Sequence, residues 1–149
     1  VLLLEAGLSC EIEVKSLNFS IKIAGKVDRI EERNGAIRII DYKTGKVDGN
    51  SLKIQDFGDL TSDIKNEKII QLLCYALMFE NHELKQNREV SAGIVSFKNM
   101  KNGFLPFGLG KGKEAGLVIS TEILEDFKLE LEKLIVEIFN TEIAFKEKI

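Results

Sequence analysis

The sequence predicts an α/β (α+β) fold, in which a central mixed β-sheet with an antiparallel hairpin meander is flanked by helices. Two observations carry this prediction. The first third of the chain alternates apolar and polar residues in short runs, as half-buried strands do. The remainder holds two helical patterns with one further apolar strand run between them.

Strand patterns fill the first third of the chain. The alternating runs are residues 11–15, 18–23, 26–33 and 36–43. Asn34 and Gly35 stand between the last two runs, and Asn-Gly is the strongest short hairpin signal because both residues tolerate the positive φ of a type I′ turn. We therefore expect the runs 26–33 and 36–43 to form a hairpin.

A long helix is expected in the middle of the chain. Ser62 or Asp63 can cap it, and its pattern continues to about Leu84. From Ile69 to Phe79 the pattern is apolar on nearly every face, which is typical of a buried helix.

The last third of the chain predicts a second, amphipathic helix. Ser120 or Thr121 can cap it, and it runs to about Phe139. Its apolar stripe consists of Leu124, Phe127, Leu131, Leu134, Ile135 and Ile138. The other segments are predicted as loops over 46–62 and 99–115, a strand over 90–97 and a short strand over 117–119.

The composition suits a single domain over residues 1–149, because 44% of the residues are hydrophobic and can form a core. The chain begins at Val1 in mid-pattern, without an initiator Met, so we expect it to be a fragment of a longer protein. No apolar stretch is long enough to span a bilayer. The net charge of −3 argues against a protein that coats phosphates with its whole surface. A role on nucleic acid needs a local basic patch, a metal ion or neighbouring domains.

Cysteine and histidine are scarce, which leaves few parts for zinc or Ser-His-Asp chemistry. Cys10 and Cys74 form no CxxC pair, and Cys74 lies in the apolar helical run, where a buried, reduced thiol is expected. Such a thiol fits a reducing, cytoplasmic setting. His82 is expected at a solvated helix end.

The hairpin register places two carboxylates opposite each other. A two-residue loop pairs Arg33 with Ala36, and counting outward brings Asp28 to Asp41. The same count pairs Glu31 with Arg38 and Ile30 with Ile39. One face then carries Asp28, Ile30, Ile37, Ile39, Asp41 and Lys43. The other face carries Arg29, Glu31, Arg33, Arg38 and Tyr42, and is expected to be solvated or ion-paired, with a Glu31–Arg38 pair.

Opposed carboxylates on a core-facing surface need an explanation, because like charges destabilise a sheet and a half-buried carboxylate either raises its pKa or binds a cation. With Lys43 beside them, Asp28 and Asp41 provide the hard oxygen ligands that Mg²⁺ prefers, next to an ammonium group. These are the parts of metal-assisted phosphodiester hydrolysis. Either motif taken singly is more often a surface salt bridge or the end of a strand and its turn.

Gln71 and Tyr75 lie four residues apart, on one face of the first helix. Core packing explains Tyr75 by itself, and Gln71 can be a chance polar residue. A glutamine in an apolar run nevertheless needs a hydrogen-bond partner, which a catalytic site or a DNA phosphate supplies.

Three segments together resemble a known family. They are Gly25-Lys26-Val27-Asp28-Arg29, Ile39-Ile40-Asp41-Tyr42-Lys43-Thr44-Gly45 and Gln71-Leu72-Leu73-Cys74-Tyr75. They resemble the G-x-x-D-R, D-Y-K-T-G and Q-x-x-x-Y motifs of RecB-like nucleases, a PD-(D/E)XK branch found in helicase–nucleases and CRISPR adaptation nucleases. The resemblance is close over residues 20–98 and implies a restriction-endonuclease-like fold.

The resemblance also implies roles for individual residues. Asp28, Asp41 and the Tyr42 backbone carbonyl would bind Mg²⁺ or Mn²⁺. Lys43 would orient or deprotonate the attacking water and stabilise the charge of the transition state. Gln71 and Tyr75 would organise the site and the scissile DNA strand.

Two departures from the family pattern stand out. The family often has an upstream acidic or histidine residue on an N-terminal helix, for which Glu5 is only a weak substitute. Many relatives hold an iron–sulfur cluster, and Cys10 and Cys74 do not fit its cysteine pattern, so no cluster is supported within this chain. Phe145 lies near where the closing cysteines of that pattern would begin.

We therefore expect a Mg²⁺-dependent deoxyribonuclease that acts in DNA repair or recombination, with DNA and a helicase domain or subunit as partners and no membrane. The rival interpretation is a catalytically inactive nuclease fold that serves as a DNA-binding or interaction module. A third, a structural α/β domain without a nucleic-acid role, fits the acidic net charge and leaves Asp28, Asp41 and Lys43 unexplained.

Overall fold

A computed structural model describes residues 1–58, 60, 66–98, 100–110 and 116–147, and the side chains of these residues as far as 137. The main sheet has the strand order β1-β2-β3-β5-β6. Its strands are β1 (Leu3–Val14), β2 (Phe19–Arg33), β3 (Ala36–Lys43), β5 (Val90–Ser96) and β6 (Phe104–Pro106). Strands β3 and β5 pair in parallel and the other neighbours pair antiparallel, so the predicted mixed sheet is confirmed. A second, two-stranded sheet joins β4 (Lys53–Ile54) to β7 (Gly108–Leu109).

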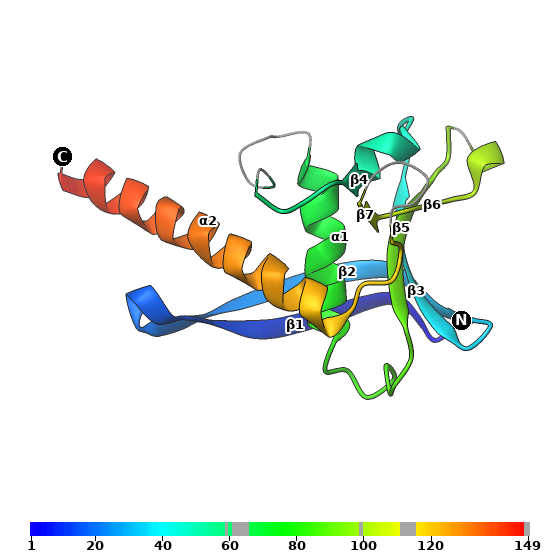
Figure 1. The fold of residues 1–149 in the computed structure, drawn as a ribbon, viewed down its shortest axis with the longest axis horizontal. Coiled ribbons are helices and arrows are strands. Elements are labelled where there is room, and N and C mark those ends of the chain that lie inside the picture. The colour runs from blue at the N-terminus through cyan, green and yellow to red at the C-terminus, as the bar shows by residue number, and fades with distance from the viewer. Residues whose placement is uncertain (59, 61–65, 99, 111–115, 148–149) are drawn as a thin grey trace.

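Two helices flank the sheet, α1 (Glu67–Phe79) and α2 (Thr121–Glu147). Helix α1 contacts strands β1, β2, β3 and β5, and α2 packs on α1 and β1 (Figure 1). The part of the chain that the structure describes contains no helix long and apolar enough to cross a membrane.

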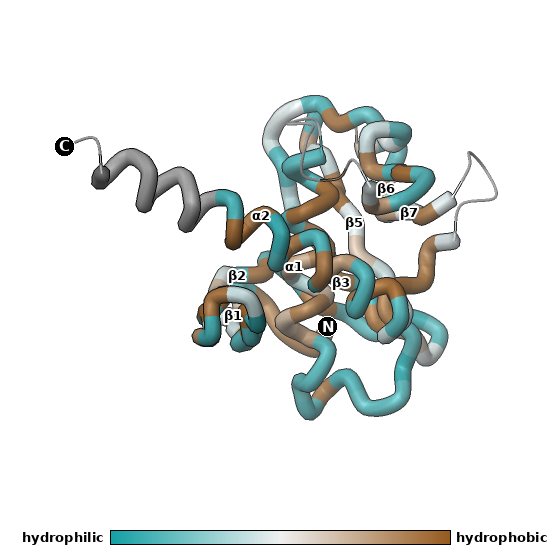
Figure 2. Tube along the Cα trace, turned by 60° about the vertical axis from the view of Figure 1, so that its left-hand side comes forward, coloured by the Kyte–Doolittle hydropathy of each residue, from teal (hydrophilic) through white to brown (hydrophobic). Residues whose placement is uncertain are grey.

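Helix α1 is buried, as its apolar pattern predicts. Its buried residues are Ile69, Leu72, Leu73, Tyr75, Ala76, Leu77, Met78 and Phe79. The helix ends at Phe79, short of the predicted Leu84, and a polar connection of turns follows it outside the apolar interior (Figure 2). His82 explains part of this difference, because its Nδ1 accepts the Leu84 N–H at 3.1 Å and its ring packs edge-on against Phe79. His82 is therefore half-buried and not a solvated residue. The predicted caps Ser62 and Asp63 lie outside the described residues.

Strand β2 joins the two predicted runs 18–23 and 26–33 into one continuous strand. Gly25 does not interrupt it. A Cβ atom at Gly25 would meet Met78 Cε at 3.4 Å and Tyr75 Cε1 at 3.6 Å, so the glycine lets the strand pass close beneath α1. Strand β1 reaches β2 through the 3₁₀ turn η1 (Lys15–Leu17).

The hairpin of β2 and β3 has the predicted turn, with φ of 54° at Asn34 and 82° at Gly35. The predicted register holds from Arg33–Ala36 to Arg29–Ile40, where the ladder ends, one pair before Asp28 and Asp41.

The face of the hairpin away from α1 differs from the solvated surface that was predicted. The Arg38 guanidinium lies over the Phe104 ring of β6, 3.9 Å from its centroid. Glu31 is the cross-strand partner of Arg38, but its ion pair is with Arg29 at 3.0 Å. Ile40 of β3 is buried as well.

Both predicted loops contain short elements. The segment 46–62 includes η2 (Gly49–Leu52) and β4, and the segment 99–115 includes η4 (Met100–Asn102), β6 and β7. The predicted strand 117–119 joins no ladder, although the Ile119 N–H donates to the Val90 carbonyl at 2.7 Å.

Helix α2 begins at its predicted cap, where the Ser120 Oγ accepts the Ile123 N–H at 3.2 Å. It extends beyond the predicted end at Phe139. Within its stripe Leu124, Phe127 and Leu131 are buried, Leu134 and Ile135 are partly buried, and the side chain of Ile138 lies outside the described set.

The two cysteines are free thiols that pack against the core. Cys74 is half-buried, and its burial raises the pKa of its thiol to about 11. Burial also raises the pKa of the Cys10 thiol.

Gly93 of β5 offers a test of the packing between β5 and β6. A Cβ atom there would overlap the Leu105 carbonyl oxygen and lie 2.6 and 2.7 Å from two carbons of the Phe104 ring. We expect Gly93→Ala to lower the free energy of unfolding by ~1–3 kcal/mol, as measured by urea denaturation. Gly7→Ala is the control, because nothing lies within 4 Å of a Cβ at Gly7. An equal effect of the two substitutions would contradict this packing.

Candidate active site

A chain of polar contacts connects the end of β3 to α1. Lys43 Nζ lies 2.9 Å from Asp41 Oδ2 and donates a 2.9 Å hydrogen bond to Gln71 Oε1. Gln71 Nε2 in turn donates to Tyr75 Oη at 2.9 Å. The structure thus brings together four residues that the sequence singled out, and it gives Gln71 the hydrogen-bond partners that its apolar surroundings demand.

Asp28 joins this group through the backbone of β3. Its Oδ2 accepts the Tyr42 N–H at 2.8 Å. Beyond the last β2–β3 pair, the carboxylate thus replaces the backbone carbonyl that would accept this N–H in a regular sheet. A hydrogen bond to this N–H fixes the carboxylate beside Asp41. The two aspartates are neighbours, though not through the direct pairing that the hairpin count predicts.

A break in the regular strand geometry accounts for the position of Asp28. Both ladders of β2 omit it: the β1–β2 register passes from Leu4–Arg29 to Ala6–Val27, and Glu5 in between has a φ of +46°. Val27 and Ile30 are both fully buried, although strict alternation would place them on opposite faces. The strand changes its facing at Asp28, and irregularities of this kind re-aim side chains.

Asp41 is a buried carboxylate with 5% of its surface exposed. Burial raises the pKa of this carboxyl above its ordinary value, and the charge of Asp28 adds to the rise, while the Lys43 ammonium opposes it. The Lys43 ammonium contacts the buried Asp41 Oδ2 at 2.9 Å and compensates part of its charge.

These groups fit a divalent cation. A buried carboxylate whose charge its surroundings disfavour, next to a second carboxylate, is an environment that a further cation stabilises. Tyr42 can add its backbone carbonyl: the N–H and C=O of a strand residue point to the same side, and the Tyr42 N–H points to Asp28.

The described residues contain no group of three or more His, Cys, Asp or Glu that could hold a metal, so among them Asp28 and Asp41 are the carboxylates grouped at this site. Glu5 lies in the same gap of the β1–β2 register as Asp28, between the pairs Leu4–Arg29 and Ala6–Val27, but its side chain is exposed and the structure does not group it with the aspartates.

Tyr75 closes the network on the helix side. Burial raises the pKa of its hydroxyl, as do the charges of Asp41 and Asp28, and the hydrogen bond with Gln71 acts in the opposite direction. The hydroxyl therefore keeps its proton at neutral pH and can donate a hydrogen bond.

The sequence did not point to two residues at the end of β5 that contact the site. The Ser96 Oγ donates to the Gly45 carbonyl at 2.6 Å and holds the turn that follows Lys43. The Phe97 N–H donates to the Lys43 carbonyl at 2.9 Å, and its half-exposed ring stacks on Tyr42 with a centroid separation of 5.5 Å. Parallel strands end at the same edge of a sheet, and that rule could have pointed to both residues.

Comparison with known families decides the classification. The model of the PD-(D/E)XK nuclease superfamily matches residues 4–148. The chain belongs to the PD-(D/E)XK nuclease superfamily. Searches of curated proteins and of solved structures gave no match.

The observed sheet and flanking helices agree with the restriction-endonuclease-like fold of PD-(D/E)XK proteins. Members of the superfamily are typically nucleases and generally use divalent metal ions such as Mg²⁺. Membership thus supports nuclease activity, and Asp28, Asp41, Lys43, Gln71 and Tyr75 remain the predicted site of this PD-(D/E)XK chain.

A stability measurement tests the electrostatics of Asp41. Its raised pKa means that the surroundings disfavour the charged carboxylate at neutral pH, even with Lys43 beside it. We expect Asp41→Asn to raise the free energy of unfolding in metal-free buffer at pH 7, because the neutral amide avoids the cost of burying the charge, and urea denaturation measures the change. Asp126→Asn on the exposed surface of α2 should change little. A large loss of stability in Asp41→Asn would show that the charged form is favoured.

Proposed function

We propose that this chain is a divalent-metal-dependent DNA nuclease that hydrolyses phosphodiester bonds, as a RecB-like nuclease domain of a helicase–nuclease in DNA repair or recombination. The observation that carries the proposal is the buried Asp41 carboxylate, which lies beside Asp28 and contacts Lys43. The three sequence motifs support the RecB-like assignment, because they contain Asp28, Asp41, Lys43, Gln71 and Tyr75.

In this proposal Asp28, Asp41 and the Tyr42 carbonyl hold Mg²⁺ or Mn²⁺. The ion, when bound, would polarise the scissile phosphate and lower the pKa of a bound water. Three oxygen ligands from the protein leave room for water and phosphate oxygens in an octahedral shell.

Lys43 acts on the reacting groups. Its ammonium is held by Gln71 and Asp41 at the mouth of the site, where it can orient the attacking water and stabilise the negative charge that builds on the phosphoryl oxygens. Tyr75 fixes Gln71, so both helix residues position Lys43.

A catalytically inactive nuclease fold, used as a DNA-binding or interaction module, is the second candidate. It is favoured by the count of two carboxylates at the site, with no third acidic, His or Cys residue grouped with them among the described residues. A module that only binds has no use for a lysine that stabilises a transition state, so Lys43 separates the two candidates.

Metal binding gives the first test. Titration of Mg²⁺ or Mn²⁺ followed by calorimetry should show weak binding to the wild type, since most of the shell is left to water and DNA, and no binding to Asp41→Ala. Asp56→Ala, which removes an exposed carboxylate elsewhere, should bind the metal as the wild type does. Ca²⁺ should bind without supporting cleavage, because its geometry is looser. Cleavage that persists in EDTA would overturn the metal requirement.

Removal of Lys43 gives the second test. Lys43→Ala should lower the cleavage rate of plasmid and oligonucleotide DNA by about two orders of magnitude or more, because a preorganised charge is lost from the transition state. DNA binding, measured by fluorescence anisotropy, should change little, because one phosphate contact is a small part of such an interface.

Lys46→Ala, at an exposed lysine in the following turn, is the matched control and should retain activity. A parallel loss of DNA binding and cleavage in Lys43→Ala would favour the binding module. A wild type without turnover under any metal would do the same.

A further inference from the structure

The main sheet has a face that points away from helix α1. Along β3, Asp41 and Lys43 lie on the helix side, where Lys43 bonds to Gln71, and α2 packs on α1. Tyr42 stands between these two residues and points to the opposite side, because side chains alternate along a strand. We call this opposite side the outer face. It carries Arg29, Arg33, Arg38, Tyr42, Phe97 and Phe104.

Aromatic rings lie on the outer face in two places. The Phe97 ring stacks on Tyr42, with planes 14° apart and centroids separated by 5.5 Å, and 52% of the Phe97 surface is exposed. The Phe104 ring lies over Gly93, where the absence of a side chain lets it rest against the sheet. The Arg38 guanidinium lies over this second ring, 3.9 Å from its centroid. Both places offer a planar group on which another planar group can stack.

The outer face is basic, although the whole chain has a net charge of −3. The β2–β3 register places Arg33 and Arg29 on the same side as Arg38. Glu31 lies among these three arginines, and its ion pair is with Arg29 at 3.0 Å. The segment 90–110, which includes β5 and β6, adds two lysines and has no acidic residue. A polyanion is therefore attracted to this side of the sheet.

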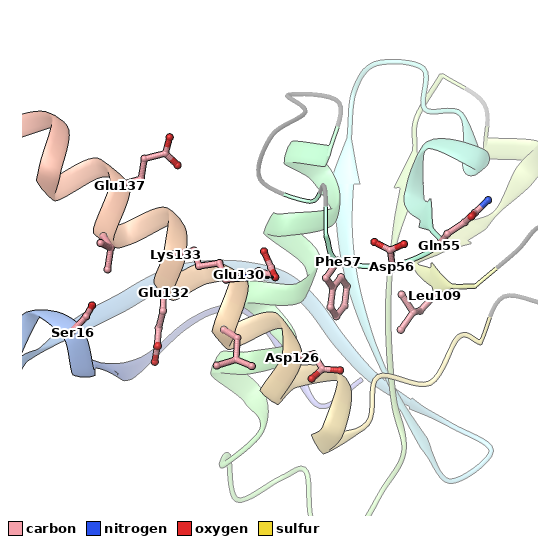
Figure 3. A pocket seen from close by; sticks show the side chains of 12 residues that line it. Ser16, Gln55, Asp56, Phe57, Leu109, Asp126, Glu130, Glu132, Lys133 and Glu137 are labelled. Carbon is pink, nitrogen blue, oxygen red and sulfur yellow. Dashed lines mark hydrogen bonds and ion pairs between the residues drawn. The ribbon is translucent and has the colours of Figure 1, made fainter.

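Aromatic rings among basic side chains are the means by which proteins bind single-stranded nucleic acid, because the bases stack on the rings and the cations meet the phosphates. The bases of a duplex are stacked on one another and cannot reach the rings. The groove along α2 is different, since it is lined by carboxylates that include those of Asp126 and Glu132 (Figure 3). Phosphates would be repelled there, so the outer face is the surface that suits a nucleic-acid strand.

We propose that the outer face binds a single strand of DNA. Its bases would stack on Phe97 and on the Arg38 guanidinium, and its phosphates would lie near Arg33. The part of β3 from 36 to 42 spans about 20 Å at ~3.3 Å per residue, which suits a segment of about four nucleotides. This surface lies on the other side of the sheet from the proposed nuclease centre, and only the choice of DNA over RNA rests on the proposed function.

A tryptophan introduced at position 97 reports stacking directly, because the chain has no tryptophan of its own. The probe is an oligothymidylate of about 16 nucleotides, added in EDTA to remove the metal that cleavage is expected to need. We expect this probe to quench the fluorescence of Phe97→Trp. The matched control is Phe19→Trp, because Phe19 is 40% exposed and lies at the start of β2, away from the outer face. Its fluorescence should not change.

Fluorescence anisotropy with the same oligonucleotide, labelled with fluorescein, measures affinity at one fixed salt concentration. Phe97→Ala should weaken binding at least about fivefold, because a stacked base is lost, and Phe19→Ala should bind as the wild type does. Arg33→Glu should weaken binding as well. Lys15→Glu makes the same change of charge at an exposed residue of η1 and should weaken binding far less. Circular dichroism should show an unchanged fold in all four variants, since the four residues are exposed.

The double variant Phe97→Trp, Lys43→Ala separates the outer face from the predicted active site. Lys43 lies on the helix side, so the quenching should persist when it is removed. A loss of quenching in the double variant would place the strand in the active site and overturn the proposal. A wild type that binds the oligonucleotide through Phe97 and cleaves no DNA would count against the nuclease and not against the outer face.

Further results would also overturn the proposal. One is equal quenching in Phe97→Trp and Phe19→Trp, and another is an unchanged affinity in Phe97→Ala. A third is a duplex of the same length that binds as tightly as the single strand, because stacking on the rings would then not be the mode of binding. Tighter binding of an oligouridylate would make RNA the ligand. Quenching confined to position 97, with weaker binding by Phe97→Ala and Arg33→Glu, supports single-stranded DNA on the outer face.

Discussion

Helix α1 is apolar nearly all round, so it has to be covered on every side, and this constraint organises the molecule. Four strands of the sheet contact it on one side, and α2 packs on it from another. Polar side chains interrupt this apolar cover where Gln71 and Tyr75 meet Lys43 at the end of β3. Polar side chains that are enclosed in this way must satisfy each other, and this requirement holds the amide, the phenol and the lysine in one geometry.

The same enclosure places a carboxylate where it is unfavourable. Asp41 follows two buried isoleucines on β3 and points to the core side of the sheet, so its charge lies in surroundings that oppose it. The extensive apolar packing around α1 offsets this local cost. Binding sites for charged ligands often contain such a group, because a carboxylate whose charge the protein stabilises poorly keeps its capacity to bind a cation.

Local signals allowed the hairpin to be predicted and left its end undefined. Asn34-Gly35 fixes the turn, and the turn fixes the register as far as Arg29–Ile40. The irregularity at Asp28 coincides with a positive φ at Glu5 of the neighbouring strand, and no residue pattern within β2 predicts it. The grouping of Asp41, Lys43 and Gln71 was predictable because motif spacing and strand facing agree. The contact of Phe57 with Phe127 was not predictable, since it brings together residues seventy positions apart in sequence.

The parallel pairing of β3 with β5 has a consequence for the assembly of the site. Parallel neighbours cannot be joined by a tight turn, and the chain between these two strands includes α1. The bond from Ser96 to Gly45 spans 51 positions and the one from Lys43 to Gln71 spans 28, whereas the hairpin closes locally. Closing loops of this length costs more conformational entropy than closing the hairpin. The contacts of Lys43 with Gln71 and of Ser96 with Gly45 therefore depend on the packed tertiary structure and not on the hairpin alone.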